Sequence, residues 1–212
     1  MAVICLEGAS AVGKTTTSQE IARKTNAYVV PEVNLLFERP KNEPKTWYLE
    51  RQVERWQMAQ EKQSEYDMVI LDGDIFQPLN YNWCFDFKVF NQSLAFIYEF
   101  YREELSVGRI KFPDKYFYLY TSHSNLKCRK ENDQTRKRGN FEKHLEILEP
   151  HQRYYEAVNR FEPQLVHLVE ANNIEENIGV IINNSPSSSL DRNSGKLLDN
   201  IMYWLEQNKS HY

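Results

Sequence analysis

Short apolar runs alternate with longer amphipathic segments along the chain, and polar or turn-forming residues separate them. The short runs are typical of buried strands, whereas apolar residues at helical spacing indicate amphipathic helices. The predicted strands cover residues 2–6, 27–30, 67–71, 115–120 and 180–182. The predicted helices cover residues 15–25, 44–64, 91–107, 124–138 and 197–206, and another begins at Phe141. The predicted loops cover residues 76–90 and 185–195.

Strands and helices that alternate in sequence favour a parallel sheet with helices on both faces. We therefore predict an α/β fold with five parallel strands in a three-layer α/β/α arrangement. A length of 212 residues is usual for one domain, so we expect a single domain over residues 1–212. Ligands of such folds bind beyond the carboxyl ends of the strands, and this rule places the candidate site at that edge of the sheet.

Residues 8–15 match the phosphate-binding pattern G-x-x-x-x-G-K-[ST] between the first predicted strand and the first predicted helix. Gly8 and Gly13 allow a tight turn and a close approach to an anion. The N–H groups of the loop and the helix N-terminus direct positive charge toward that anion. The segment therefore predicts a P-loop NTPase fold that binds a nucleoside triphosphate. The residues expected to bind the nucleotide are Gly8, Ala9, Ser10, Ala11, Val12, Gly13, Lys14, Thr15 and Thr16.

Three residues are candidates for the chemistry at this loop. Lys14 is expected to reach the β- and γ-phosphates, and Thr15 to offer its hydroxyl to Mg²⁺. Asp72 ends the apolar run 67–71, where P-loop enzymes place the acid that holds the Mg²⁺ shell. An Asp-Gly-Asp sequence is also ordinary turn chemistry at a strand end. ATP and Mg²⁺ are the predicted cofactors, and GTP stays open as the donor.

Two further acids follow predicted strands. Glu32 comes after the strand 27–30, and a carboxylate there can accept a proton from a hydroxyl or bind a sugar hydroxyl. Asp74 lies two residues beyond Asp72 and is a second candidate for substrate binding. For both residues, a structural or solvated loop acid is the alternative interpretation.

A basic cluster follows the fourth predicted strand and is expected to form a mobile lid at about residues 124–141. Arg129 and Arg136 are two helical turns apart and share a face of the predicted helix. From that face they can stabilise charge on transferring phosphates as catalytic residues, and Arg138 is expected to contact the nucleotide. Asp133 is spaced for ion pairs with both catalytic candidates, so a solvated, salt-bridged face is the alternative.

The predicted helix 44–64 carries two further candidates for substrate binding. Gln52 can hydrogen-bond the edge of a base, and Arg51 is kept as a second candidate on the same helix. Core packing and surface exposure explain the other aromatic and basic residues of this helix. For the aromatic segment 76–90, three interpretations stay open: the lining of a substrate pocket, a flap over the core, or a dimer contact.

The composition argues against several classes of protein. A net charge of −4 gives no basic field for nucleic-acid binding. Cys5, Cys84 and Cys128 are far apart and form no C-x-x-C motif, which indicates a reducing cytosol. The N-terminal run lacks the basic start of a signal peptide, and no segment approaches a membrane span. We expect a cytoplasmic protein with a small-molecule partner, and a homodimer stays open.

Several of these motifs together resemble one group of kinases. Residues 5–8 (CLEG) leading into 13–16 (GKTT) are similar to the opening of deoxynucleoside kinases and thymidylate kinases. Residues 30–33 (VPEV) resemble the motif after strand two of deoxynucleoside kinases, whose glutamate acts as general base for the sugar hydroxyl. Residues 127–141 and the helix after them resemble the arginine-rich lid of that family.

The resemblance implies an ATP-dependent kinase that moves the γ-phosphate of ATP to a small acceptor. In that family an arginine follows the acid after strand three, whereas this chain has Asp72-Gly73-Asp74. A monophosphate acceptor requires several cations nearby, so the missing arginine favours the hydroxyl of a nucleoside or similar alcohol. Many relatives also carry a glycine at the position of Ala11.

Two alternatives stay open at this point. A nucleoside-monophosphate kinase, similar to thymidylate kinase, would need Arg39, Arg51 or Arg55 to supply the missing cation. A regulatory ATP-binding protein or ATPase would turn over ATP without any small acceptor.

Overall fold

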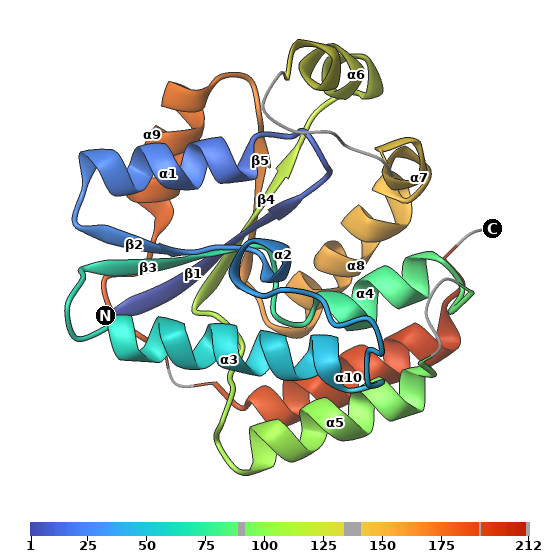
Figure 1. The fold of residues 1–212 in the computed structure, drawn as a ribbon. Coiled ribbons are helices and arrows are strands. Elements are labelled where there is room, and N and C mark those ends of the chain that lie inside the picture. The colour runs from blue at the N-terminus through green and yellow to red at the C-terminus, as the bar shows by residue number, and fades with distance from the viewer. Residues whose placement is uncertain (89–91, 134–140, 191, 211–212) are drawn as a thin grey trace.

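We describe the protein from a computed structural model, which covers residues 1–88, 92–133, 141–190 and 192–210. At its centre is a parallel sheet of five strands in the order β2-β3-β1-β4-β5 (Figure 1). The strands are β1 (Ala2–Gly8), β2 (Ala27–Val30), β3 (Met68–Asp72), β4 (Lys115–Tyr120) and β5 (Val166–Glu170). The helices are α1 (Lys14–Lys24), α2 (Val33–Leu36), α3 (Trp47–Lys62), α4 (Gln77–Cys84), α5 (Leu94–Ser106), α6 (His123–Asn132), α7 (Phe141–Glu146), α8 (Leu148–Phe161), α9 (Ile174–Asn184) and α10 (Ser194–Gln207).

Helices cover both faces of the sheet and give the molecule three layers. In Figure 1, α1 and α9 lie on one face, whereas α3, α5 and α10 lie on the other. Alternate residues of β1 serve the two cores: Ile4 and Leu6 pack on the α1 side, and Val3 and Cys5 on the α3 side. Because both faces are covered, the strand is apolar along most of its length. The predicted α/β/α fold is confirmed.

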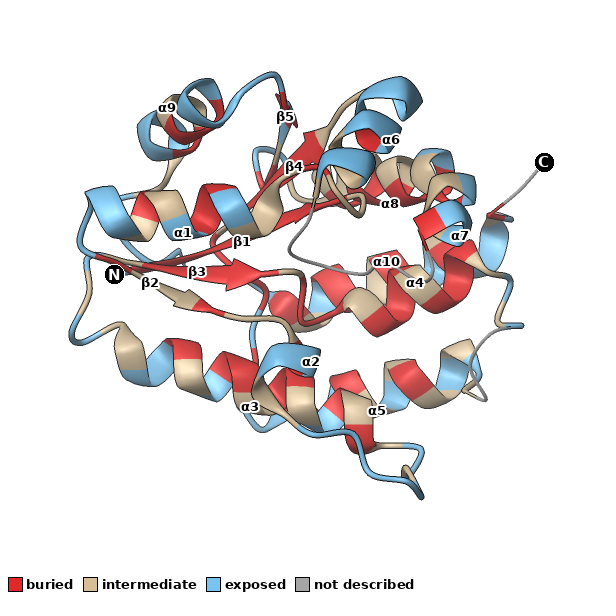
Figure 2. Ribbon diagram, turned by 45° about the horizontal axis from the view of Figure 1, so that its top comes forward, coloured by how far each residue is buried: buried red, intermediate tan, exposed pale blue. Residues whose placement is uncertain are grey.

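Burial is concentrated in the strands and on the inward faces of the helices, as Figure 2 shows. Every residue of β1 is buried, and the outer helix faces are exposed. No helix in the described ranges is both long enough and apolar enough to cross a membrane.

The fifth strand differs from the sequence prediction, which was wrong at residues 180–182. These residues lie within α9, and the edge strand is β5. A short apolar run fits a strand or a buried helix face equally well, and Ile178 and Ile181 belong to the core on the α1 side. β5 carries a weaker signal because Leu168 and Glu170 are exposed, so its sequence is not a continuous apolar run.

Two other segments differ from expectation. Residues 76–90 contain the helix α4 instead of only a loop; its Pro78 lies in the first turn, where the missing N–H has no helical partner to lose. The predicted helix 124–138 is α6 as far as Asn132, and residues 134–140 lie outside the described part of the chain. The remaining predicted strands and helices are found with bounds shifted by at most a few residues.

Candidate active site

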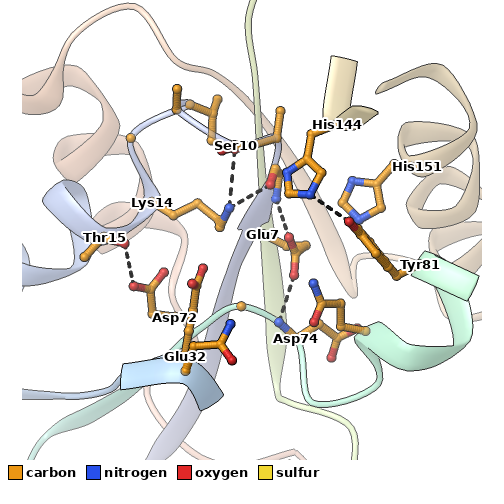
Figure 3. Close-up of a pocket in the computed structure, with 18 of the residues that line it drawn as sticks. Glu7, Ser10, Lys14, Thr15, Glu32, Asp72, Asp74, Tyr81, His144 and His151 are labelled. Atoms are coloured by element: carbon orange, nitrogen blue, oxygen red, sulfur yellow. Dashed lines mark hydrogen bonds between the residues drawn. The ribbon is translucent and has the colours of Figure 1, made fainter. Parts of the chain in front are cut away.

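The P-loop follows β1 and leads into α1 at the carboxyl edge of the sheet (Figure 3). Gly8 and Gly13 have φ values of 137° and 108°, which residues with a side chain rarely adopt. A Cβ on Gly8 would also lie 2.1 Å from the carbonyl oxygen of Leu119 in β4. Backbone conformation and available space therefore both require glycine at the start of the loop.

Ala11 also has a positive φ, 68°, although it carries a side chain. This left-handed conformation costs an L-residue about 1–2 kcal/mol, whereas glycine adopts it freely but loses more backbone entropy on folding. We expect Ala11→Gly to raise the free energy of unfolding by up to about 1 kcal/mol and to leave nucleotide affinity unchanged. Urea unfolding and a nucleotide titration check this, and a less stable variant would argue against strain at Ala11.

Lys14 contacts the backbone of the P-loop, and Thr15 connects the loop with β3. The Nζ of Lys14 donates to the carbonyl oxygens of Gly8, at 2.7 Å, and Ala9, at 3.3 Å. The hydroxyl of Thr15 donates to Oδ2 of Asp72 at 2.7 Å. The ammonium of Lys14 therefore lies over the loop, and Asp72 lies directly beside its threonine (Figure 3).

Asp72 has the properties of a cation ligand. Its side chain is buried, and its Oδ1 has no hydrogen-bond partner among the described residues. Burial raises the pKa of this carboxyl, and the charge of Lys14 lowers it. Mg²⁺ usually takes one or two carboxylates together with water and phosphate oxygens, so it does not need a larger cluster of ligands. Among the described residues, no group of three or more His, Cys, Asp or Glu side chains is placed to hold a metal ion. Thr15 and Asp72 are the residues that could hold Mg²⁺.

Glu32 lies beside Asp72 at the same edge of the sheet (Figure 3). It is the half-buried residue that immediately precedes α2. Its charge raises the pKa of Asp72, which places the two carboxylates within electrostatic range of each other. The structure thus brings the acids that follow β2 and β3 together, as the sheet topology predicts.

One cavity of about 1430 Å³ contains all of these groups, and every residue from Gly8 to Thr16 lines it. Pockets for one small ligand are commonly about 300–1,000 Å³, so this cavity has room for a nucleotide and a second small molecule. Further side chains that line it come from α3, α4, α7 and α8. Among them are Tyr48, Arg55, Gln77, Tyr81, Asn82, His144 and His151.

These further side chains are polar groups that the sequence does not mark with a motif. The hydroxyl of Tyr48 donates to Oε1 of Gln77 at 2.9 Å, and the hydroxyl of Tyr81 lies 2.7 Å from Nε2 of His144. Burial lowers the pKa of His151 to about 3, with a smaller contribution from Lys14, so this imidazole is neutral at pH 7. The aromatic composition of residues 76–90 is the one sequence signal that points to this lining.

Asp74 lines the cavity, and its carboxylate belongs to a buried hydrogen-bond network. Its Oδ1 accepts hydrogen bonds from the hydroxyl of Tyr116 and the N–H of Phe76, at 2.9 and 3.0 Å. Its Oδ2 accepts from the hydroxyl of Tyr155 at 3.0 Å, and its N–H donates to Glu7. Both carboxyl oxygens therefore have partners within the fold, which favours a structural role for Asp74 over substrate binding.

The buried carboxyl of Asp74 makes stability depend on pH. Burial, followed by the charge of Glu7, raises its pKa from 3.8 to about 7. The folded state then holds a proton that the unfolded state has released, so this residue lowers the free energy of unfolding as pH rises from about 4 to about 7. We expect the free energy of unfolding of Asp74→Asn, measured relative to that of the parent, to be higher at pH 8 than at pH 5. Urea unfolding of both proteins at both pH values measures this, and an equal difference at the two pH values would refute it.

The structure does not support Arg51 and Gln52 as substrate-binding residues. Among the described residues that line the cavity, neither is present. Gln52 is buried, and its Oε1 accepts a hydrogen bond from Arg55. Arg51 pairs with Glu54 and lies over the ring of Phe37. The orientation of α3 therefore places Tyr48 in the lining of the cavity and places Arg51 and Gln52 outside that lining.

Arg129 reaches the P-loop from α6. Its guanidinium donates to the carbonyl oxygens of Val12, at 2.7 Å, of Ala171 and of Asn172, at 3.2 Å. It lines the cavity and joins α6 to the P-loop and to the segment after β5. Its contact with a transferring phosphate stays a prediction. The other lid candidates, Arg136 and Arg138, lie outside the described residues.

A parallel sheet in this strand order, with a P-loop after its first strand, defines an α/β fold of the P-loop NTPase type. Deoxyadenosine kinase from M. mycoides, solved with bound dATP, is similar over 86% of this chain and 98% of its own, with a TM-score of 0.56 and 18% identity. Thymidylate kinase from Candida albicans is similar over 90% and 95%, with a TM-score of 0.57 and 14% identity. No protein-family model and no curated protein sequence matches the chain. At these identities the likeness shows a shared fold.

Proposed function

We propose that the protein is an ATP-dependent kinase that transfers the γ-phosphate of ATP to the hydroxyl of a nucleoside or a similar alcohol. The observation that carries this proposal is that Lys14, Asp72 and Glu32 line one cavity beside the P-loop (Figure 3). The two solved structures with the same fold, a deoxyadenosine kinase and a thymidylate kinase, support the reaction class.

On the donor side, the loop N–H groups and the N-terminus of α1 would bind the phosphates of ATP. Lys14 would exchange its carbonyl partners in the loop for oxygens of the β- and γ-phosphates, where its charge stabilises the transition state. Mg²⁺ held at Thr15 and Asp72 would neutralise charge on the same phosphates. Arg129 would keep α6 against the loop through the carbonyl oxygen of Val12.

On the acceptor side, Glu32 would accept the proton of the attacking hydroxyl. The hydroxyl oxygen forms a bond to the γ-phosphorus while the bond from that phosphorus to the β–γ bridging oxygen breaks. The products are ADP and the phosphorylated acceptor. The rings and amides of α3 and α4 that line the cavity suit a flat, polar acceptor, because aromatic side chains combine apolar faces with polar tips.

The charges near the acceptor favour a neutral hydroxyl over a monophosphate. Arg39 and Arg55 line the cavity, but both have partners, and Arg39 forms an ion pair with Glu43. Arg55 is buried and donates to carbonyl oxygens. Arg51 is absent from the described lining. Arg39 and Arg55 are therefore already engaged by oxygens of the protein, whereas a phosphate would require several cations nearby.

Acceptor-dependent ADP formation tests the proposal. Purified protein with MgATP is offered nucleosides, nucleoside monophosphates and small polyols in separate reactions, each repeated with MgGTP. The proposal predicts ADP formation that increases with a nucleoside or another alcohol. Stimulation by monophosphates alone would favour a nucleoside-monophosphate kinase, and a rate that no acceptor changes would favour an ATPase.

A further inference from the structure

Arg55 is a buried cation on the inward side of α3, with 1% of its surface exposed. Its hydrogen bonds within the described part of the chain all go to neutral oxygens, three of the backbone and one of the Gln52 amide. Burying a charge is costly unless its donors are satisfied. The segments that the guanidinium of Arg55 connects therefore indicate its role.

The guanidinium joins the ends of two neighbouring strands. Its Nε donates to the carbonyl oxygen of Pro31, just beyond β2, at 2.7 Å. Its Nη2 donates to the carbonyl oxygens of Asp72 and Gly73, at the end of β3, at 2.8 and 3.0 Å. Arginine presents its donors in one rigid plane, so these bonds fix the distance between the two segments.

The position of these bonds relative to the sheet is informative. The paired register of β2 and β3 ends at Val30 opposite Leu71. The next residues along the two strands are Pro31 and Asp72, and Arg55 bonds the carbonyl oxygens of both. The side chain therefore continues the cross-strand connection by one step at the point where the strand ladder stops.

We infer that Arg55 is a positioning residue that fixes the separation between Glu32 and Asp72, the acids carried by these two strand ends. This inference rests on the proposed function, because it gives Arg55 a part in the same reaction. The positive charge of Arg55 also offsets the repulsion between the two carboxylates, because charges interact more strongly in a buried site than in water. Gln52 completes the arrangement by accepting from Nη1 at 2.7 Å.

Arg55→Lys tests the inference, because lysine keeps the charge but replaces the planar group with a single ammonium. We expect kcat to fall about tenfold or more. We also expect the Mg²⁺ concentration that gives half of the maximal increase in ATP affinity to rise about tenfold. Affinity for ATP without Mg²⁺ should stay within about twofold, because the P-loop contacts are unchanged. Calorimetric titration of ATP at several Mg²⁺ concentrations gives a readout that does not depend on activity.

Arg192→Lys is the matched control. Arg192 is also largely buried, and it bonds Glu162 and the carbonyl oxygen of Asp114, which precedes β4 at the amino end of the sheet. This variant should lose stability without any change in kcat or Mg²⁺ dependence. If Arg55→Lys loses only stability, as the control does, the positioning role is wrong.

A second variant covers the case in which Arg55→Lys does not fold. Gln52→Leu keeps the arginine but removes the amide that orients it, and we expect smaller changes in kcat and Mg²⁺ dependence in the same direction. Unchanged values in a folded Gln52→Leu would contradict the inference. If the parent binds MgATP but phosphorylates no acceptor, the proposed function fails, and the Mg²⁺ titrations still test Arg55.

Discussion

Lys14→Ala is expected to lower the rate of phosphoryl transfer by at least about a hundredfold, because it removes a preorganised positive charge from the phosphates. The Nζ of Lys14 lies over the P-loop, within 2.7 Å of the carbonyl oxygen of Gly8. Arg129 also reaches the loop, but its guanidinium donates to carbonyl oxygens. The measurement is the steady-state rate of ADP formation with a saturating acceptor.

The control for this variant is Lys62→Ala. Lys62 is in the last turn of α3, where it pairs with Glu65 at the surface. The Lys62→Ala variant should form ADP at the rate of the parent. Equal melting temperatures of the two variants would show that the loss at Lys14 is chemical. A Lys14→Ala protein as fast as the parent would refute the assignment of the P-loop to the donor site.

Glu32→Gln is expected to lower kcat by about 10²–10⁴-fold, the usual contribution of a general base. Glutamine has nearly the same shape but cannot accept the proton of the acceptor hydroxyl. Affinity for MgATP should change little, because the P-loop and the Thr15–Asp72 pair, which are proposed to hold the phosphates and Mg²⁺, are unchanged. Single-turnover phosphorylation, together with an ATP-binding titration, separates the two effects.

Glu38→Gln is the matched control for Glu32→Gln, since Glu38 is an exposed acid in the segment that follows α2. It should leave kcat unchanged. If Glu32→Gln retained the parent kcat, another group would have to accept the proton. Loss of MgATP affinity without loss of kcat would instead place Glu32 at the donor.

The sequence is sufficient to predict the part of the site that depends on local motifs and on strand ends. The P-loop pattern marks Gly8, Gly13 and Lys14 because the chemistry requires those residue types at that spacing. The acids after β2 and β3 can be predicted because parallel strands place their carboxyl ends at one edge. The same reasoning assigns the α/β/α layers, although it misplaces the edge strand, whose exposed positions resemble a loop.

The rest of the site depends on how helices pack against the sheet, and this the sequence does not specify. On α3, Tyr48 lines the cavity whereas Gln52 is buried beneath it, and only the rotation of the helix decides between them. Three of the four hydrogen bonds that Arg55 donates go to backbone carbonyl oxygens of two distant segments. Backbone carbonyls carry no residue identity that a sequence pattern could reveal.

The most direct test of the proposed phosphoryl transfer follows the labelled phosphate itself. The protein is incubated with γ-labelled ATP and a panel of nucleosides, nucleoside monophosphates and small alcohols, and the labelled products are separated and identified. The proposed kinase activity predicts label in the monophosphate ester of a nucleoside or similar alcohol, with no such product from Lys14→Ala. Label that appears only in nucleoside diphosphates, or only in inorganic phosphate whichever acceptor is present, would contradict it.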